Sequence, residues 1–139
     1  MTIQSVLLPV FVLVLLTFIL LFWMGRERVG ALTRGELKPN AIALGQDAWP
    51  KRPAQLSRSF QNQFETPVLF YVLVALAIIT KKDDFLFVVL EWLYVISRIV
   101  HAGIHTTNNR INLRFSAFAV GVGILIVMWV IFAVRILLS

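Results

Sequence analysis

Two stretches of the chain carry polar and ionisable side chains at the spacing of a helix face. The first set comprises Arg58, Asn62 and Glu65, and the second set comprises Arg98, His101 and His105. Their separations of three, four and seven positions place each set on one side of a helix. An ionisable side chain within a bilayer costs roughly 2.5 to 3.5 kcal/mol, so such residues usually face a partner or a wet cavity.

The residue types in these sets favour a site for a small, mostly anionic molecule. Arginine binds carboxylates through paired hydrogen bonds, the Glu65 carboxylate could receive an ammonium group, and Asn62 could both donate and accept. Three further basic residues are expected at the same level of the fold, and they are Arg26, Arg28 and Arg114. Glutathione has the matching pattern of two carboxylates, one ammonium group and a thiol.

A purely structural role explains the same residues about as well. Glu65 could pair with Arg98 to neutralise buried charge, and the histidines could bond to backbone groups. His101 and His105 are also four residues apart, a spacing that can hold a metal ion. Zinc needs a third protein ligand and the nearby arginines repel a cation, so we expect no metal here. A haem is disfavoured because one helix cannot easily supply ligands on both sides of its ring.

The composition indicates that the elements carrying these residues lie in a membrane. Of the 139 residues, 59% are hydrophobic and only 14% are charged, and the mean hydropathy is +0.84. A soluble domain carries about a quarter charged residues, and one small core could not bury this much apolar surface. We attribute the net charge of +6 to basic loops beside the membrane and expect no nucleic-acid partner. The absence of cysteine excludes disulfides and thiolate metal sites.

Four apolar segments are long enough to cross a bilayer, which predicts an all-α four-helix bundle in a single domain, residues 1–139. The expected spans are residues 5–24, 63–80, 85–107 and 113–138. The second span reaches sufficient length only if its helix begins earlier, near Ala54. The first loop, residues 25–53, contains several glycines and prolines and is expected to be irregular, with a short helix near Ala41 to Leu44.

The distribution of basic residues predicts the orientation in the membrane. The first loop is basic, the third loop carries Arg110 and Arg114, and the N-terminal tail has no lysine or arginine. The positive-inside rule puts these two loops in the cytoplasm and both termini outside it. The chain ends without an endoplasmic-reticulum retrieval signal, so we expect a bacterial inner membrane.

The most distinctive pattern is RSFQNQFETP at residues 58–67, with asparagine and glutamate three apart and a proline shortly after. It resembles the second-helix signature of the MAPEG family, the membrane-associated proteins of eicosanoid and glutathione metabolism. The sequence RIVH at residues 98–101, followed by Asn108, Asn109 and Arg114, is similar to that family's third helix and third loop. The resemblance extends over nearly the whole chain and looks like the family's divergent bacterial branch.

This resemblance implies a left-handed four-helix bundle that assembles as a homotrimer, with glutathione sites between adjacent subunits near the cytoplasmic face. The residues that would contact glutathione are Asn62, Glu65, Arg98, His101, and either Arg26 or Arg28. Among them, Glu65 would bind the amino group, and Arg114 would stabilise the thiolate. The implied activity is attack of that thiolate on lipophilic small molecules dissolved in the bilayer, as a transferase or peroxidase.

Four positions depart from the family pattern and affect the enzymatic inference more than the fold. Gln61 replaces a basic residue, His105 a tyrosine, Phe115 a serine and Phe118 a second tyrosine. Arg58 and His105 remain candidate ligand-binding residues. The alternative to an enzyme is a non-catalytic membrane protein of the same fold that binds another anionic metabolite or a lipid. A proton-coupled transporter is disfavoured because the charges gather at one level and form no path.

Overall fold

In residues 2–43 and 48–139, which the computed structural model describes, the chain forms five α-helices, one short 3₁₀-helix and no strand. Within these residues, four helical segments are long and apolar enough to cross a membrane. They are Ile3–Thr33, Lys51–Ile79, Phe85–Thr106 and Ile111–Leu137. The predicted all-α fold with four membrane-spanning helices is therefore confirmed.

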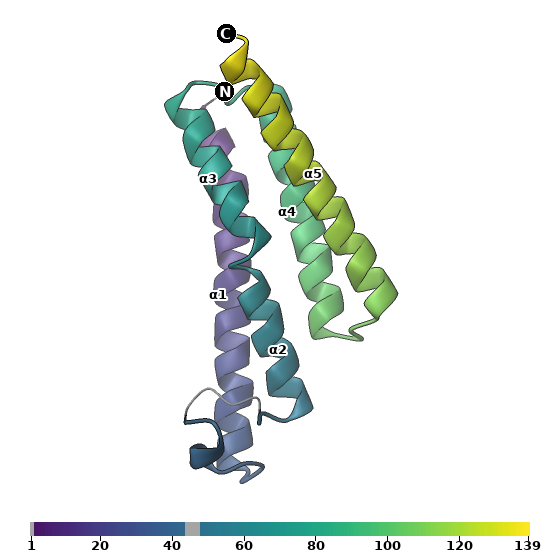
Figure 1. Cartoon of the computed structure of the whole chain (residues 1–139). Coiled ribbons are helices and arrows are strands. Elements are labelled where there is room, and N and C mark those ends of the chain that lie inside the picture. The colour runs from purple at the N-terminus through teal and green to yellow at the C-terminus, as the bar shows by residue number, and fades with distance from the viewer. Residues whose placement is uncertain (1, 44–47) are drawn as a thin grey trace.

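The helices are arranged as two groups that diverge toward one end of the molecule (Figure 1). The elements are α1 (Ile3–Thr33), α2 (Lys51–Asn62), α3 (Thr66–Ile79), α4 (Phe85–Thr106) and α5 (Ile111–Leu137). The α4–α5 hairpin leans away from α1 and α2 where the α1–α2 and α4–α5 connections lie, and both termini lie at the opposite end. We call the end with these connections the basic end, because its arginines include Arg26, Arg28, Arg52, Arg58, Arg110 and Arg114.

Helix α1 is longer than the sequence indicates. The predicted span ends at residue 24, but the helix continues to Thr33 through residues that were expected to be irregular. Contacts with α2 explain the extension: Arg28 Nη2 donates to Ser57 Oγ at 2.8 Å, and Ala31 is fully buried. A glycine within a helix costs about 1 kcal/mol relative to alanine, and tertiary packing of this kind commonly offsets that cost.

The rest of the first loop is also organised differently from the prediction. A 3₁₀-helix, η1, occupies Pro39–Ala41, just before the short helix expected near Ala41 to Leu44. Leu44 itself lies outside the described residues. Helix α2 begins at Lys51, within the predicted loop of residues 25–53, so the connection between α1 and α2 is shorter than expected at both ends.

The second span is interrupted at the basic half of the bundle. Helix α2 ends at Asn62 and α3 begins at Thr66, so the continuous helix expected over residues 63–80 starts later and is separated from α2. Pro67 explains the break, because proline lacks an amide hydrogen and its ring clashes with the carbonyl four residues earlier. The backbone tightens there into 3₁₀-type bonds, including the Gln63 amide donating to the Phe60 carbonyl at 3.0 Å.

Helices α4 and α5 pack closely along an antiparallel hairpin. A Cβ added at Gly121 would lie 2.8 Å from Ser97 Oγ, so a larger residue there would require the Ser97 side chain to move. At the end opposite the basic end, Arg135 Nη2 lies 2.9 Å from Asp84 Oδ2. Asp84 also caps α4 by accepting from the Phe87 amide at 3.1 Å.

The ion pair at Asp84 should make stability depend on pH in the acid range. The hydrogen bond from Arg135 is the main cause that lowers the pKa of the Asp84 carboxyl below its ordinary value of 3.8. A carboxyl of this kind stabilises the fold fully above its ordinary pKa, and that stabilisation is lost as the pH falls through the lowered folded-state pKa. Asp84→Asn keeps a capping side chain and should lower the free energy of unfolding near neutral pH by less than about 1 kcal/mol, because the pair is partly exposed.

Thermal unfolding in detergent measures this effect between neutral pH and about pH 3. The difference between wild type and Asp84→Asn should shrink below pH 3.8. Asp83→Asn is the control, because it removes the same charge from the adjacent position. A difference that stays constant over the whole range would contradict the role of the ion pair.

Candidate functional site

A pocket of about 420 Å³ lies at the basic end between α2, α4 and α5, and we call it the main pocket. The predicted site residues that line it are Arg58, Asn62, Glu65, His101, His105 and Arg114. They meet because the end of α2, the end of α4 and the start of α5 lie at one level of the bundle. Five of the six residues in the two helix-spaced sets of the sequence thus line one pocket, and the exception is Arg98.

Arg98 does not line the main pocket but holds part of its wall. Its side chain is 2% exposed, and its guanidinium donates to the Asn62 side-chain oxygen and, at 3.4 Å, to the Asn62 carbonyl. The Asn62 amide nitrogen in turn donates to Glu65 Oε1 at 3.4 Å. The link from Arg98 to Glu65 therefore runs through Asn62 rather than through the direct ion pair that the sequence allows. The break after α2 permits this arrangement, because it leaves the Asn62 carbonyl outside a regular helical ladder.

The two histidines are buried in the pocket wall. His101 is 3% exposed and His105 is 6% exposed, and their ring centroids lie 5.7 Å apart. The Nδ1 atom of each ring is buried and has no hydrogen-bond partner among the described residues, so the backbone bonds that the sequence allows are not formed at these atoms. A buried polar atom without a partner is costly, and a bound ligand is one way to satisfy it.

The structure offers no metal cluster beside these histidines. Within residues 2–43 and 48–139, no three side chains among His, Asp, Glu and Cys are grouped so that they could hold a metal ion. The site instead combines arginine, imidazole, amide and carboxylate groups, which suits an organic ligand with several charges.

Arg114 is fixed by the loop that precedes its helix. Its Nη1 donates to Asn109 Oδ1 at 2.8 Å. Asn109 adopts a left-handed backbone conformation with φ 53°, which asparagine tolerates better than most residues, and its amide donates to the Ile104 carbonyl at 2.8 Å. The sequence indicates Asn109 only as part of a loop pattern. Its role in orienting Arg114 emerges from the fold, and an asparagine next to a helix start is the signal that could have found it.

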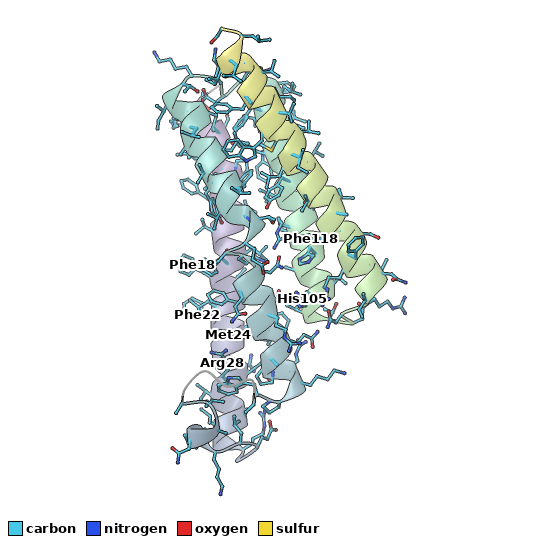
Figure 2. The ribbon with its side chains drawn as sticks, viewed as in Figure 1. Phe18, Phe22, Met24, Arg28, His105 and Phe118 are labelled. Carbon is cyan, nitrogen blue, oxygen red and sulfur yellow. The ribbon has the colours of Figure 1, made fainter. Side chains whose placement is uncertain are left out.

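Apart from Arg114, the residues that α5 contributes to the main pocket are apolar. Ile111, Phe115 and Phe118 line it, and the Phe118 ring centroid lies 5.9 Å from that of His101. Figure 2 shows His105 near the lower end of α4 and Phe118 farther from the basic end. The sequence identifies both phenylalanines only as departures from a family pattern. The pocket therefore combines charged and polar groups from α2 and α4 with Arg114 and three apolar side chains from α5.

The two arginines at the end of the first predicted span differ in their surroundings. Arg28 donates to Ser57 and lies over the Trp49 ring, with its Cζ atom 4.8 Å from the ring centroid. Arg26 is exposed and does not line the main pocket of its own chain. The structure thus does not bring Arg26 together with the other predicted site residues, and it gives Arg28 a packing role between α1 and α2.

The fold and this pocket define a multi-pass membrane protein with a charged site at one end of a four-helix bundle. Residues 6–134 of the sequence match the MAPEG family, so the protein belongs to that family. Members generally use glutathione, and membership therefore fits a glutathione-related role in the membrane. Comparison with curated proteins and with solved structures gave no match.

Proposed function

We propose that the protein binds glutathione in the main pocket and transfers its thiolate to lipophilic electrophiles. The observation that carries this proposal is the presence of Glu65 in one pocket with the cations Arg58 and Arg114. Glutathione needs both kinds of group, because it carries one ammonium and two carboxylates. Family membership supports the same ligand independently of this geometry.

In this proposal each polar side chain has a separate task. Glu65 receives the ammonium group, Asn62 hydrogen-bonds the peptide, and Arg58 receives a carboxylate. Arg98 is a positioning residue that acts through Asn62, to which it donates. The buried histidines complete the contacts to the bound tripeptide.

The proposed reaction is a nucleophilic displacement by sulfur. The thiol gives its proton to solvent, the thiolate electron pair forms a bond to the electrophilic carbon, and the leaving group departs with its bonding pair. Arg114 stabilises the thiolate, because a cation in a partly dry site lowers the pKa of a thiol. With a hydroperoxide, the thiolate attacks oxygen and releases an alcohol. A second glutathione then reduces the sulfenic acid and yields the disulfide and water.

The assembly and location belong to the same proposal. We place the basic end in the cytoplasm of a bacterial inner membrane, because lysine and arginine gather in cytoplasmic loops. We also propose a homotrimer in which Arg26 reaches the site of a neighbouring subunit, which its exposure at the basic end permits. Phe18 and Phe22, which are 51% and 72% exposed, project from α1 away from the hairpin and contact lipid or a neighbouring subunit (Figure 2). The bilayer holds the apolar substrate.

A second candidate function is binding of another anionic metabolite without turnover. It is favoured by Phe115 and Phe118, whose rings line the pocket and offer no hydroxyl to a bound thiol. A ligand screen that finds binding of another anionic metabolite without turnover would favour this alternative. Rapid conjugation of a standard electrophile would exclude it.

Glutathione binding by Glu65 is the first test of the proposal. Millimolar glutathione should raise the Tm of the detergent-purified protein, and Glu65→Gln should weaken binding about tenfold or more. The reason is that the mutant loses a charge-assisted hydrogen bond to the ammonium group. Glu27→Gln is the control, because it removes the same charge from α1 and does not line the main pocket. A folded wild type without protection, or equal protection of all three proteins, would contradict the proposal.

A further inference from the structure

A second pocket of about 330 Å³ adjoins the main pocket at the basic end, and we call it the outer pocket. The side chains shared by the two pockets are Arg58, His105 and Arg114. The outer pocket adds Trp49 and Lys51, which do not line the main pocket. Its described lining residues are cationic or neutral, whereas the main pocket contains the Glu65 carboxylate. This difference in charge indicates a different ligand group for the outer pocket.

The start of α2 adds to the positive potential of the outer pocket. The helix is 12 residues long and begins at Lys51. Pro50 precedes it and makes no side-chain capping bond, and the first turn contains no acidic residue. The first amide groups of a helix lack internal partners and carry the positive end of its dipole, so an uncapped start favours a bound anion.

His105 is an independent indication of a ligand at this place. Only 6% of it is exposed, and it lines both pockets. Its Nδ1 atom has no hydrogen-bond partner among the described residues. Hydrogen bonds hold the residues around His105 in place. Gln55 Nε2 donates to the His105 carbonyl at 2.6 Å and to the Thr107 carbonyl at 3.1 Å. Arg114 donates to Asn109 Oδ1. A ligand can therefore bind between residues that already have defined positions.

We propose that the outer pocket binds the phosphoryl group of a phosphate ester. A phosphoryl group presents several oxygen acceptors, which can bond Lys51, Arg114, an imidazole N–H and helix-start amides at once. The pocket is larger than a phosphate ion alone, so part of the esterified group fits beside Trp49. The ester is either a phospholipid head group at the membrane surface or a soluble phosphate ester. The proposal does not depend on glutathione binding in the main pocket.

Phosphate binding can be measured on the full chain purified in a maltoside detergent, which contains no phosphate group. Inorganic phosphate should raise the Tm relative to chloride at equal ionic strength, and Lys51→Gln should weaken this binding about tenfold. Lys38→Gln is the matched control, since Lys38 is exposed in the connection before α2 and does not line the outer pocket. Lys51→Gln should leave glutathione affinity unchanged, because Lys51 does not line the main pocket.

A second arm of the experiment distinguishes the two sources of phosphate. Mixed micelles of the same detergent with phosphatidic acid replace the soluble ion with a lipid phosphate. If soluble phosphate protects wild type and Lys38→Gln but not Lys51→Gln, the ligand is a soluble ester. If only phosphatidic acid gives this pattern, the ligand is a lipid head group. No protection in either arm, or equal protection of all three proteins, would overturn the proposal.

Discussion

Arg114→Ala is expected to slow the conjugation of glutathione to a lipophilic electrophile by about a hundredfold in kcat. Arg114 lies in the main pocket and is held by Asn109 Oδ1 at 2.8 Å, so its charge is in place before the thiolate forms. A fixed cation in a partly dry site stabilises developing negative charge without reorganisation, which makes its loss expensive. The affinity for glutathione should fall less, by under about tenfold, because other groups bind the tripeptide.

Steady-state kinetics and a binding titration on the same preparations separate these two effects. Arg110→Ala is the matched control, because Arg110 is exposed beside the start of α5 and does not line the main pocket. Asn109→Ala should give a smaller loss of kcat, since Arg114 keeps its charge but loses its anchor. If Arg114→Ala kept full kcat, Arg114 would have no part in stabilising the thiolate.

Asn62→Leu is expected to lower the free energy of unfolding by about 2 to 3 kcal/mol in the absence of any ligand. Arg98 is 2% exposed and donates to both the side chain and the carbonyl of Asn62. Removing the amide leaves a buried guanidinium without its side-chain acceptor, and such an orphaned charge costs more than the bond itself contributed. The double variant Asn62→Leu/Arg98→Met should recover most of the loss, because it removes the orphaned charge as well.

Thermal unfolding of the detergent-purified proteins measures this coupling through a double-mutant cycle. Gln61→Leu is the control, since it makes the same kind of change at the neighbouring exposed position on α2. Its effect should be small. A double variant no more stable than Asn62→Leu alone would show that the bond to Arg98 is not what Asn62 supplies to the fold.

The sequence by itself determined the fold class, and it predicted the end of the bundle at which the candidate site lies. The length of an apolar segment shows whether it can cross a bilayer, and the spacing of residues shows which of them share a helix face. Both can be determined from a short stretch of the chain. That is why spacing alone assigns Arg58 and Asn62 to one helix face, and His101 and His105 to another. The short second connection then requires antiparallel neighbours, which brings both faces to the same end.

Other features could not be predicted, because they depend on how helices are rotated and packed against one another. The extension of α1 to Thr33 is stabilised by contacts with α2, such as the bond from Arg28 to Ser57, against the local preference of a glycine-containing segment. The break before α3 has a signal in Pro67, but the proline alone does not reveal that the Asn62 carbonyl accepts from a buried arginine as well as from the Glu65 amide.

Only the tertiary structure decided which charged groups share a bond. Sequence spacing allows a direct pair between Arg98 and Glu65, whereas the fold inserts Asn62 between them. The order of the predicted spans also groups Arg26 with the site, and the fold leaves it exposed outside the main pocket. The physical reason is that a spacing rule gives the face of one helix, while a hydrogen bond requires the relative position and rotation of two.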